Sequence, residues 1–275
     1  MPIANVLSIA GSDPSGGAGI QADLKTFSAL KTYGMAVISG LTAQNTQGVQ
    51  AIENPSPDFV DAQLRSILDD VRVDAIKIGM LGSAKVIERV ARRLRDHYSG
   101  PVILDPVMVA KSGHALLPQD AVSSLREHLL PLATLVTPNL PEADVLTGAR
   151  TTAREHMTDT ARALLELGPE AVLLKGGHLD GEQSPDLWMS GEHHGWFESA
   201  RIASTNTHGT GCTLSSAIAA YTARGCSVQE ACERAKTYVT SAIAQSDTLS
   251  VGQGIGPVHH FHPLWDAPHT DPPSS

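Results

Sequence analysis

Short apolar runs alternate along this chain with longer stretches of amphipathic helical pattern, and this alternation limits the possible folds more than any other feature. The apolar run at residues 5–10 predicts a buried strand, and residues 20–30 repeat apolar side chains at helical spacing. Farther along, the helical pattern of residues 85–98 leads into the apolar run 101–104. Strands that alternate with helices form crossover units, so we predict an α/β fold in which a mostly parallel sheet has helices on both faces.

The other elements predicted from the sequence follow the same alternation. Further strands are predicted at residues 35–41, 75–79, 132–136 and 171–174, and further helices at residues 59–71, 211–223 and 228–245. Two short runs, 186–189 and 196–202, predict a small antiparallel edge. We expect residues 1–266 to form a single domain and the Pro- and Ser-rich residues 267–275 to form a disordered tail.

The composition narrows the functional classes. With 20 Lys and Arg against 29 Asp and Glu, the chain carries a net charge of −9, which argues against a general nucleic-acid binder. No run approaches the ~18 consecutive apolar residues of a membrane span. The three Cys residues, at positions 212, 226 and 232, form neither a disulfide framework nor a zinc-binding spacing. Because the N-terminus also lacks a signal-peptide pattern, we expect a cytoplasmic protein.

Polar residues and glycines follow nearly every predicted strand. The segments concerned are 11–13, 42–45, 79–80, 105–108, 137–139 and 175–178. In an open parallel sheet, ligands bind beyond the carboxyl ends of the strands, where such loops meet. The sequence therefore predicts one site, built from several loops at one edge of the sheet.

The segment Gly209-Thr210-Gly211-Cys212 directly precedes a predicted helix of small residues. Its glycines allow close backbone approach, and the N–H groups at a helix start can hold an anion. A tight turn whose glycines are needed for packing would explain the same residues. The segment is not a Walker A loop, and residues 16–19 lack the spacing of a dinucleotide-binding fingerprint.

Cys212 falls in the first turn of that predicted helix. The helix dipole there favours a thiolate and predicts a lowered thiol pKa. A thiolate could remove a proton from a substrate hydroxyl, or neighbouring polar groups could align that hydroxyl. The alternative is that Cys212 is a small residue that fits under a ligand. We predict that Cys226 and Cys232 are packing residues.

Two carboxylates near strand ends, Asp105 and Glu142, are candidate partners of a metal ion. Mg²⁺ keeps several waters and uses one or two carboxylates together with substrate phosphates. Glu142 could instead be N-terminal helix charge, and Asp105 could be a turn residue before proline. The His-rich segment 259–262 lacks Cys or carboxylate partners at ligand spacing, so we predict for it a role in packing or assembly.

Six motifs occur in this chain in the same order as in one known family. They are GSDPSGGAGIQAD at 11–23, KIGML at 77–81, DPVM at 105–108, TPNLPEA at 137–143, KGGH at 175–178 and THGTGC at 207–212. On these motifs the chain resembles the hydroxymethylpyrimidine/phosphomethylpyrimidine kinases of thiamine biosynthesis, which are ribokinase-like proteins. The resemblance covers residues 3–265 and implies a ribokinase-like fold. It also implies that ATP phosphorylates the hydroxyl of 4-amino-5-hydroxymethyl-2-methylpyrimidine and that a second ATP converts the product to the diphosphate.

The resemblance assigns roles to the residues that match these motifs. Contacts to the pyrimidine are expected from Gln44, Asp23, Gly11, Met80 and Val107. The transferred phosphoryl group is expected at Gly209, Thr210, Gly211 and Cys212, and contacts to ATP and phosphate are expected from Asn139, Lys175, Gly176, Gly177 and Thr207. Mg²⁺ is expected at Asp105 and Glu142, through bound water. Such kinases usually form homodimers, and a monovalent cation is a further candidate cofactor.

Other functions fit parts of the sequence. Pyridoxal kinases share the superfamily, but close relatives that phosphorylate pyridoxal use a second Cys in the flap after the DPVM motif, and residues 109–113 contain none. A pyrimidine-binding regulator without catalysis would not need Glu142 and the 209–212 segment. A sugar kinase would need more polar residues than Met80 and Val107.

Two further expectations concern catalysis. The flap, through His114, is expected to close over the substrate as a lid that limits wasteful ATP hydrolysis. Because a phosphate acceptor is already ionised, Cys212 is expected to matter more for the first phosphorylation than for the second.

Overall fold

In the computed structural model, residues 2–109 and 117–265 are described. Within this part, one nine-stranded sheet has the order β3-β2-β1-β4-β5-β6-β7-β8-β9. Its strands are β1 (Asn5–Ser12), β2 (Tyr33–Asn45), β3 (Gly48–Glu53), β4 (Ala75–Ile78), β5 (Val102–Leu104), β6 (Leu135–Val136), β7 (Val172–Lys175), β8 (Asp186–Ser190) and β9 (His193–Phe197). The flap 110–116 and the predicted tail 267–275 lie outside the described residues, so the lid and the tail stay predictions.

Six neighbouring strands in the middle of the sheet, β2, β1, β4, β5, β6 and β7, are parallel. The pairing at both edges of the sheet is antiparallel. β8 and β9 form the predicted edge, although β9 covers 193–197 and not 196–202. Gly191, at φ +55°, forms the tight turn after β8, so β9 begins at His193 and not at residue 196 as predicted. β3, on the opposite edge, was not predicted, because its side chains are half-buried or exposed and show no apolar pattern.

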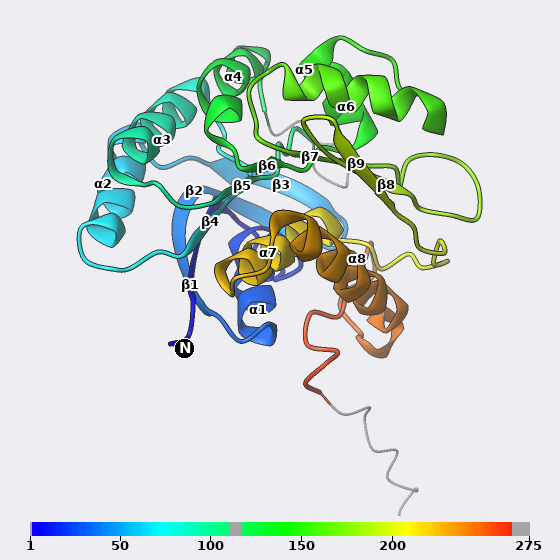
Figure 1. The fold of residues 1–275 in the computed structure, drawn as a ribbon. Coiled ribbons are helices and arrows are strands. Elements are labelled where there is room, and N and C mark those ends of the chain that lie inside the picture. The colour runs from blue at the N-terminus through cyan, green and yellow to red at the C-terminus, as the bar shows by residue number, and fades with distance from the viewer. Residues whose placement is uncertain (1, 110–116, 266–275) are drawn as a thin grey trace, which may run out of the picture.

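Helices cover both faces of the sheet (Figure 1), as predicted. One face carries α1 (Gly19–Ala29), α7 (Thr210–Ala223) and α8 (Val228–Ala244). The other carries α2 (Pro57–Leu68), α3 (Ala84–His97), α4 (Gln119–Ser124), α5 (Leu140–Thr147) and α6 (Met157–Leu165). Each helix layer forms its own apolar core against the sheet, so the fold has three layers.

α3 illustrates how the sequence builds a layer. The Ser83 side chain accepts a hydrogen bond from the N–H of Val86 and caps the helix start. Val86, Val90 and Leu94 recur at helical spacing and are buried against the sheet. Burial of each such side chain contributes about 1.5–3 kcal/mol, so the stripe fixes which face of α3 turns inward.

α7 is the helix whose N-terminus lies at the cavity described below. Its small residues, among them Ala217, Ala219 and Ala220, are fully buried, which lets the helix pack tightly between the sheet, α1 and α8. β1 pairs with β2 on one side and with β4 on the other, so the loops after β1 and β4 separate at a topological switch point. The N-terminus of α7 lines the same cavity as these loops.

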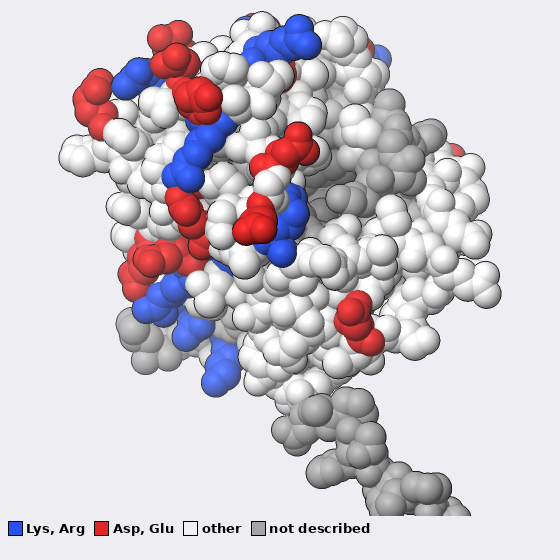
Figure 2. All heavy atoms as spheres, turned by 90° about the vertical axis from the view of Figure 1, so that its right-hand side faces the viewer, with Lys and Arg blue, Asp and Glu red and all other residues white. Residues whose placement is uncertain are grey.

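The surface shows no bias toward one charge on the side drawn in Figure 2. There, Lys and Arg side chains lie among Asp and Glu side chains. Among the described residues, none of the helices is long and apolar enough to cross a membrane.

Candidate active site

A cavity of about 790 Å³ opens at the carboxyl ends of the parallel strands. Loops after β1, β4, β5, β6 and β7 line it together with the N-terminus of α7, so several loops meet at one cavity as predicted. Thr42 and Gln44 also line it, but they lie within β2, which runs to Asn45, and not in a loop after a strand that ends at residue 41. The predicted residues on its wall are Gly11, Gln44, Met80, Asp105, Val107, Asn139, Glu142, Lys175, Gly177, Thr207, Gly209, Thr210, Gly211 and Cys212. Asp23 and Gly176 are predicted site residues that do not line it.

The start of α7 forms the middle of the cavity wall. Gly209 has φ +78°, and a Cβ atom there would lie 1.8 Å from the carbonyl oxygen of Gly17, so only glycine fits. Thr210 Oγ1 donates to the carbonyl oxygen of Thr207 at 2.8 Å and holds the turn. None of the described side chains caps this helix start. The N–H of Thr210 donates to the carbonyl oxygen of Thr207 at 3.3 Å, so the N–H groups of Gly211 and Cys212 can serve an anion.

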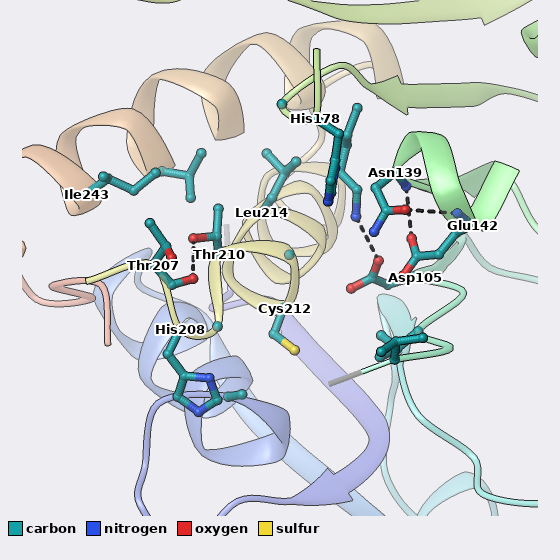
Figure 3. A pocket seen from close by; sticks show the side chains of 18 of the residues that line it. Asp105, Asn139, Glu142, His178, Thr207, His208, Thr210, Cys212, Leu214 and Ile243 are labelled. Atoms are coloured by element: carbon teal, nitrogen blue, oxygen red, sulfur yellow. Dashed lines mark hydrogen bonds and ion pairs between the residues drawn. The ribbon is translucent and has the colours of Figure 1, made fainter. Parts of the chain in front are cut away.

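Cys212 extends from this helix start, with His208 on one side and Asp105 and Glu142 on the other (Figure 3). Burial raises the pKa of the Cys212 thiol to about 11, although Lys77 acts to lower it. The prediction of a lowered thiol pKa is therefore wrong, because desolvation, with the charges of Asp23 and Asp105, outweighs the effect of Lys77. At neutral pH the thiol is protonated, so it can align a hydroxyl but is not a ready base.

Asp105, Lys175 and Glu142, with Thr137 and Ser215, form a buried group that we call the Asp105 cluster. Asp105 receives hydrogen bonds from Lys175 Nζ at 3.2 Å and from the Thr137 and Ser215 hydroxyls at 3.3 Å each. A Cβ atom at Gly211 would lie 3.5 Å from both Asp105 Oδ2 and Lys175 Nζ, so both charges face the start of α7.

Glu142 has a structural role as well as a place on the cavity wall. Its carboxylate accepts from the N–H of Asn139 at 2.8 Å, and the Asn139 side chain accepts from the N–H of Glu142 at 2.9 Å (Figure 3). This capping box starts α5, which confirms the reading of Glu142 as helix N-terminal charge. Burial raises the pKa of Glu142 to about 7; Lys175 opposes the rise and Asp105 adds to it.

The carboxylates of the Asp105 cluster are suited to hold a magnesium ion through bound water. The described residues contain no group of three or more His, Cys, Asp or Glu side chains that could hold a metal. Mg²⁺ needs only one or two carboxylates when waters and phosphates supply its other ligands. Asp105 and Glu142 offer two buried carboxylates, and the charge of Asp105 helps to raise the pKa of Glu142, an effect that a cation would relieve.

Asp23 lies below the cavity wall, in a second buried group that we call the Asp23 cluster. Its carboxylate accepts from Lys77 Nζ at 2.8 and 2.9 Å, from Ser8 Oγ at 2.6 Å and from Ser216 Oγ at 2.7 Å. All four side chains are fully buried, and Lys77 alone among them reaches the cavity wall. Asp23 therefore supports the site and is not a pocket contact.

Gly176 also acts behind the wall. A Cβ atom there would lie 2.1 Å from the carbonyl oxygen of Pro185, so the close approach of two backbones requires glycine. Its N–H lies 3.1 Å from Asp186 Oδ1, and Asp186 Oδ2 accepts from Lys236 Nζ at 2.8 Å. These contacts fix the turn that carries Lys175 and Gly177.

At the other end of the cavity, Gln44 lies between His208 and Thr42. The Met80 side chain packs against Gly11. A Cβ atom at Gly11 would lie 2.6 Å from the Met80 methyl group, so a larger residue at position 11 would displace this side chain. His208 and its partner Asp13 also line this end, and neither was assigned a role from the sequence. The sequence gives little indication of this pair, because the two residues lie 195 positions apart.

The His-rich segment packs against α8. The Tyr238 hydroxyl donates to the carbonyl oxygen of His260, and the His259 and Trp265 rings lie edge to face at 5.3 Å. His259 and His260 are buried, which agrees with the predicted role in packing.

Comparison with known proteins gives a consistent result. A family model for phosphomethylpyrimidine kinase matches residues 13–259. The hydroxymethylpyrimidine/phosphomethylpyrimidine kinase of Escherichia coli K12 is 55% identical over 262 residues, which cover 95% of this chain and 98% of that protein. The protein of that description from Rhizobium meliloti is 52% identical over 94% of this chain and 97% of its own.

Solved structures agree on the fold. A pyridoxal kinase from Staphylococcus aureus in complex with AMP-PCP and pyridoxal superposes with a TM-score of 0.88 at 34% identity over 96% of each chain. A phosphomethylpyrimidine kinase from Clostridium difficile 630 gives 0.78 at 43% identity over 87% of this chain and 99% of its own. The predicted ribokinase-like α/β fold is thereby confirmed, and the chain belongs to the phosphomethylpyrimidine kinase family.

Proposed function

We propose that this chain is an ATP-dependent kinase that phosphorylates 4-amino-5-hydroxymethyl-2-methylpyrimidine and then phosphorylates the monophosphate to the diphosphate. The observation that carries the proposal is the single cavity that has the Gln44 carboxamide at one end, the Asp105 cluster at the other and the start of α7 between them. The names of the relatives at 52–55% identity support the same activity.

The Gln44 end suits an aminopyrimidine. A carboxamide offers a donor and an acceptor side by side, which pair with a ring nitrogen and an adjacent exocyclic amine. Met80 and Val107 supply apolar wall on which a flat ring can lie. A site built for these two hydrogen bonds rejects a ring that cannot make them, because its own polar groups then stay unpaired.

The Asp105 cluster and the start of α7 suit phosphoryl transfer. This reaction needs positioning and charge stabilisation more than covalent chemistry. The N–H groups of Gly211 and Cys212 would receive the transferred group, and the Lys175 ammonium would offset its charge. Thr207, Gly177 and Asn139 line the cavity near them and would contact ATP. Asp105 and Glu142 would hold Mg²⁺ through water, and the bound ion would offset charge on the phosphate oxygens.

Cys212 acts in this proposal as an aligning group. Its protonated thiol can hydrogen-bond the acceptor hydroxyl and direct it toward the start of α7. In the second reaction the acceptor is a phosphate oxygen, which is already ionised. Cys212 therefore contributes more to the first phosphorylation.

Pyridoxal is the second candidate substrate. The observation that favours it is the close match to pyridoxal kinases, such as that of Bacillus subtilis, with a TM-score of 0.86 at 38% identity. The higher identity to the pyrimidine kinases favours the pyrimidine, and the flap sequence lacks the second Cys. A homodimer and a monovalent cation belong to the same proposal and rest on the family resemblance. A cytoplasmic location belongs to it as well and rests on the three cysteines, which form no disulfide framework.

A product assay by mass spectrometry tests the proposal. The protein is given Mg²⁺ and ATP with hydroxymethylpyrimidine, with its monophosphate, or with pyridoxal. We expect the monophosphate and then the diphosphate from the pyrimidine, the diphosphate from added monophosphate, and little pyridoxal phosphate. Pyridoxal phosphate as the main product would replace the proposal by the second candidate, and no product from any substrate would favour a binding protein without catalysis.

A further inference from the structure

Asp13 and His208 form a buried pair directly behind Gln44. Asp13 is 3% exposed and His208 is 7% exposed, and both line the Gln44 end of the cavity. Asp13 Oδ2 lies 2.7 Å from His208 Nε2, and the same ring nitrogen lies 3.3 Å from the Gln44 carboxamide atom that the structure has as Nε2. The mechanism above gives neither residue a role.

Asp13 dictates which atom of His208 carries a proton. Its carboxylate accepts from the Ser15 N–H at 2.9 Å, the Ser15 hydroxyl at 2.7 Å and the Ala18 N–H at 2.9 Å. Burial alone would raise the pKa of Asp13, but the hydrogen bonds from His208 and Ser15 outweigh it and hold that pKa below its ordinary value. An ionised carboxylate only accepts hydrogen bonds, so His208 Nε2 must carry the hydrogen that lies between them.

The hydrogen on His208 then decides how the Gln44 carboxamide is turned. A protonated ring nitrogen cannot accept a hydrogen bond from an amide NH₂, so the atom of Gln44 beside it is the oxygen. The two ends of a carboxamide have the same shape, and the hydrogen-bond network decides between them. The amide nitrogen therefore belongs at the other end, at the position 3.2 Å from Thr42 Oγ1 where the structure has Gln44 Oε1.

Thr42 is suited to receive that nitrogen. Its hydroxyl donates its single hydrogen to the carbonyl oxygen of Ser12 at 3.0 Å. The hydroxyl oxygen is then free to accept from the Gln44 amide. In this arrangement the amide hydrogen that faces Thr42 and the hydroxyl hydrogen of Thr42 both have acceptors. The opposite orientation of the amide would turn its NH₂ group toward the N–H of His208, where neither group can accept.

We propose that the Asp13–His208 pair and Thr42 together fix the Gln44 carboxamide in one orientation, so that the cavity accepts an aminopyrimidine edge in one direction only. The exocyclic amine lies on the His208 side and the ring nitrogen on the Thr42 side. This inference rests on the proposed function, because it specifies how the pyrimidine is bound. His208, Asp13 and Thr42 are positioning residues, since they act through Gln44.

The direction agrees with the chemistry of the substrate. In the proposed pyrimidine, the carbon with the hydroxymethyl group is next to the carbon with the amine. An amine on the His208 side therefore directs the hydroxymethyl group to the same side. His208 is followed directly in the chain by Gly209 and the start of α7, where phosphoryl transfer is proposed. The opposite direction would place the hydroxymethyl group away from Cys212.

Two pairs of variants test the inference. His208→Phe keeps a ring but removes the N–H, whereas His208→Gln keeps an N–H donor near the position of Nε2. Thr42→Val removes the hydroxyl with little change of shape, and Thr42→Ser keeps it. His193→Phe, at an exposed position of β9, is the control. KM and kcat are measured with the hydroxymethylpyrimidine, with its analogue that carries hydrogen in place of the amine, and with ATP.

We expect His208→Phe and Thr42→Val each to raise KM for the aminopyrimidine by about 10-fold, the effect of one lost hydrogen bond. KM for the analogue without the amine, KM for ATP and kcat should stay within about 3-fold, less than the effect of one hydrogen bond. His208→Gln, Thr42→Ser and the control should behave like the unchanged protein.

The inference is overturned if KM rises equally for both pyrimidines, or if the conservative variants lose as much as the others. If His208→Phe does not fold, the Thr42 pair decides alone, because Thr42 is half-buried and its change is nearly isosteric. Failure of the proposed function looks different: the unchanged protein would then make no pyrimidine phosphate at all.

Discussion

The Asp23 cluster and the Asp105 cluster both bury charge beside the cavity, but they satisfy it differently. Asp23 accepts four hydrogen bonds of 2.6 to 2.9 Å, two of them from Lys77. Asp105 is held by contacts of 3.2 to 3.3 Å, and its neighbour Glu142 has a pKa raised by burial to about 7. One cluster is complete without a ligand, whereas the other carries charge that is only partly compensated.

This difference separates support from chemistry. A buried ion pair whose every oxygen has a partner fixes the fold, and removal of one member leaves an uncompensated charge. A cluster with loose contacts has capacity left for phosphate and a cation. Changes in the Asp23 cluster should therefore lower stability, and changes in the Asp105 cluster should lower activity.

The largest expected effect is on stability. Lys77→Met or Asp23→Ala should each lower the free energy of unfolding by about 3–5 kcal/mol, because the remaining charge is buried without a partner. Lys77→Met combined with Asp23→Leu should recover part of this loss. Urea unfolding followed by circular dichroism measures it.

Arg162→Met is the matched control for that experiment, since Arg162 pairs with Asp159 on the surface at 60% and 86% side-chain exposure. This exposed pair should contribute only about 0–1 kcal/mol. If Lys77→Met lowers the free energy of unfolding by no more than Arg162→Met does, the Asp23 cluster does not stabilise the fold.

The next effect is on activity. Glu142→Gln should reduce kcat/KM by about 100-fold, since one of the two carboxylates that would hold Mg²⁺ through water is lost. The neutral amide can still accept from the Asn139 N–H, so the capping box survives and thermal stability should stay equal or rise. Glu192→Gln, an exposed position in the turn before β9, is the control. If Glu142→Gln lowers the melting temperature as much as Lys77→Met does, the two clusters do not differ in their contribution to stability.

His260 sharpens the comparison as a buried side chain with an unpaired polar atom. Among the described atoms, its Nε2 has no hydrogen-bond partner. Burial, followed by the positive charge of Lys25, lowers the pKa of His260 from 6.5 to about 3. The unfolded chain therefore binds a proton below pH 6.5 that the folded chain does not bind until about pH 3, so this histidine costs stability as the pH falls through that window.

His260→Phe should remove this cost. The unfolding free energy of the unchanged protein should decrease between pH 6.5 and pH 5 by up to about 1.4 kcal/mol per pH unit more than that of the variant. Urea unfolding at pH 7 and pH 5 gives both values. An identical pH dependence in the two proteins would show that His260 is not buried as the neutral ring.

The smallest expected effect concerns Cys212. Cys212→Ala should slow the first phosphorylation by about 10-fold and leave the second nearly unchanged, because only the hydroxyl acceptor needs alignment. Cys212→Ser should keep most of the first activity if the thiol acts as a hydrogen-bonding group. Single-turnover measurements of each step provide the comparison. Equal slowing of both steps by Cys212→Ala would end this account of the residue.

The sequence predicts those parts of the molecule that depend on local pattern. The apolar stripe of α3 and the polar residues after each strand follow from spacing alone, and both are confirmed. β3 was missed because its half-exposed side chains show no apolar period. α4 was missed too, and it continues as a π-helix over Leu125–Leu129, where regular α-helical spacing is lost. A strand or helix that is held mainly by its neighbours leaves little trace in its own sequence.

The site is harder to predict where its contacts are distant in sequence. Lys77 meets Asp23 across 54 positions and His208 meets Asp13 across 195, so neither pair has a spacing that could reveal it. The pKa of Cys212 was predicted in the wrong direction because the helix start is a local feature, whereas burial depends on the whole fold.

The most direct measurement is a competition. The protein receives Mg²⁺, limiting ATP and equal concentrations of hydroxymethylpyrimidine and pyridoxal, and the phosphorylated products are quantified together by mass spectrometry. The account predicts that pyrimidine monophosphate and diphosphate make up nearly all of the product. Pyridoxal phosphate in equal or greater amount would contradict it and would show that the Gln44 end of the cavity does not select an aminopyrimidine.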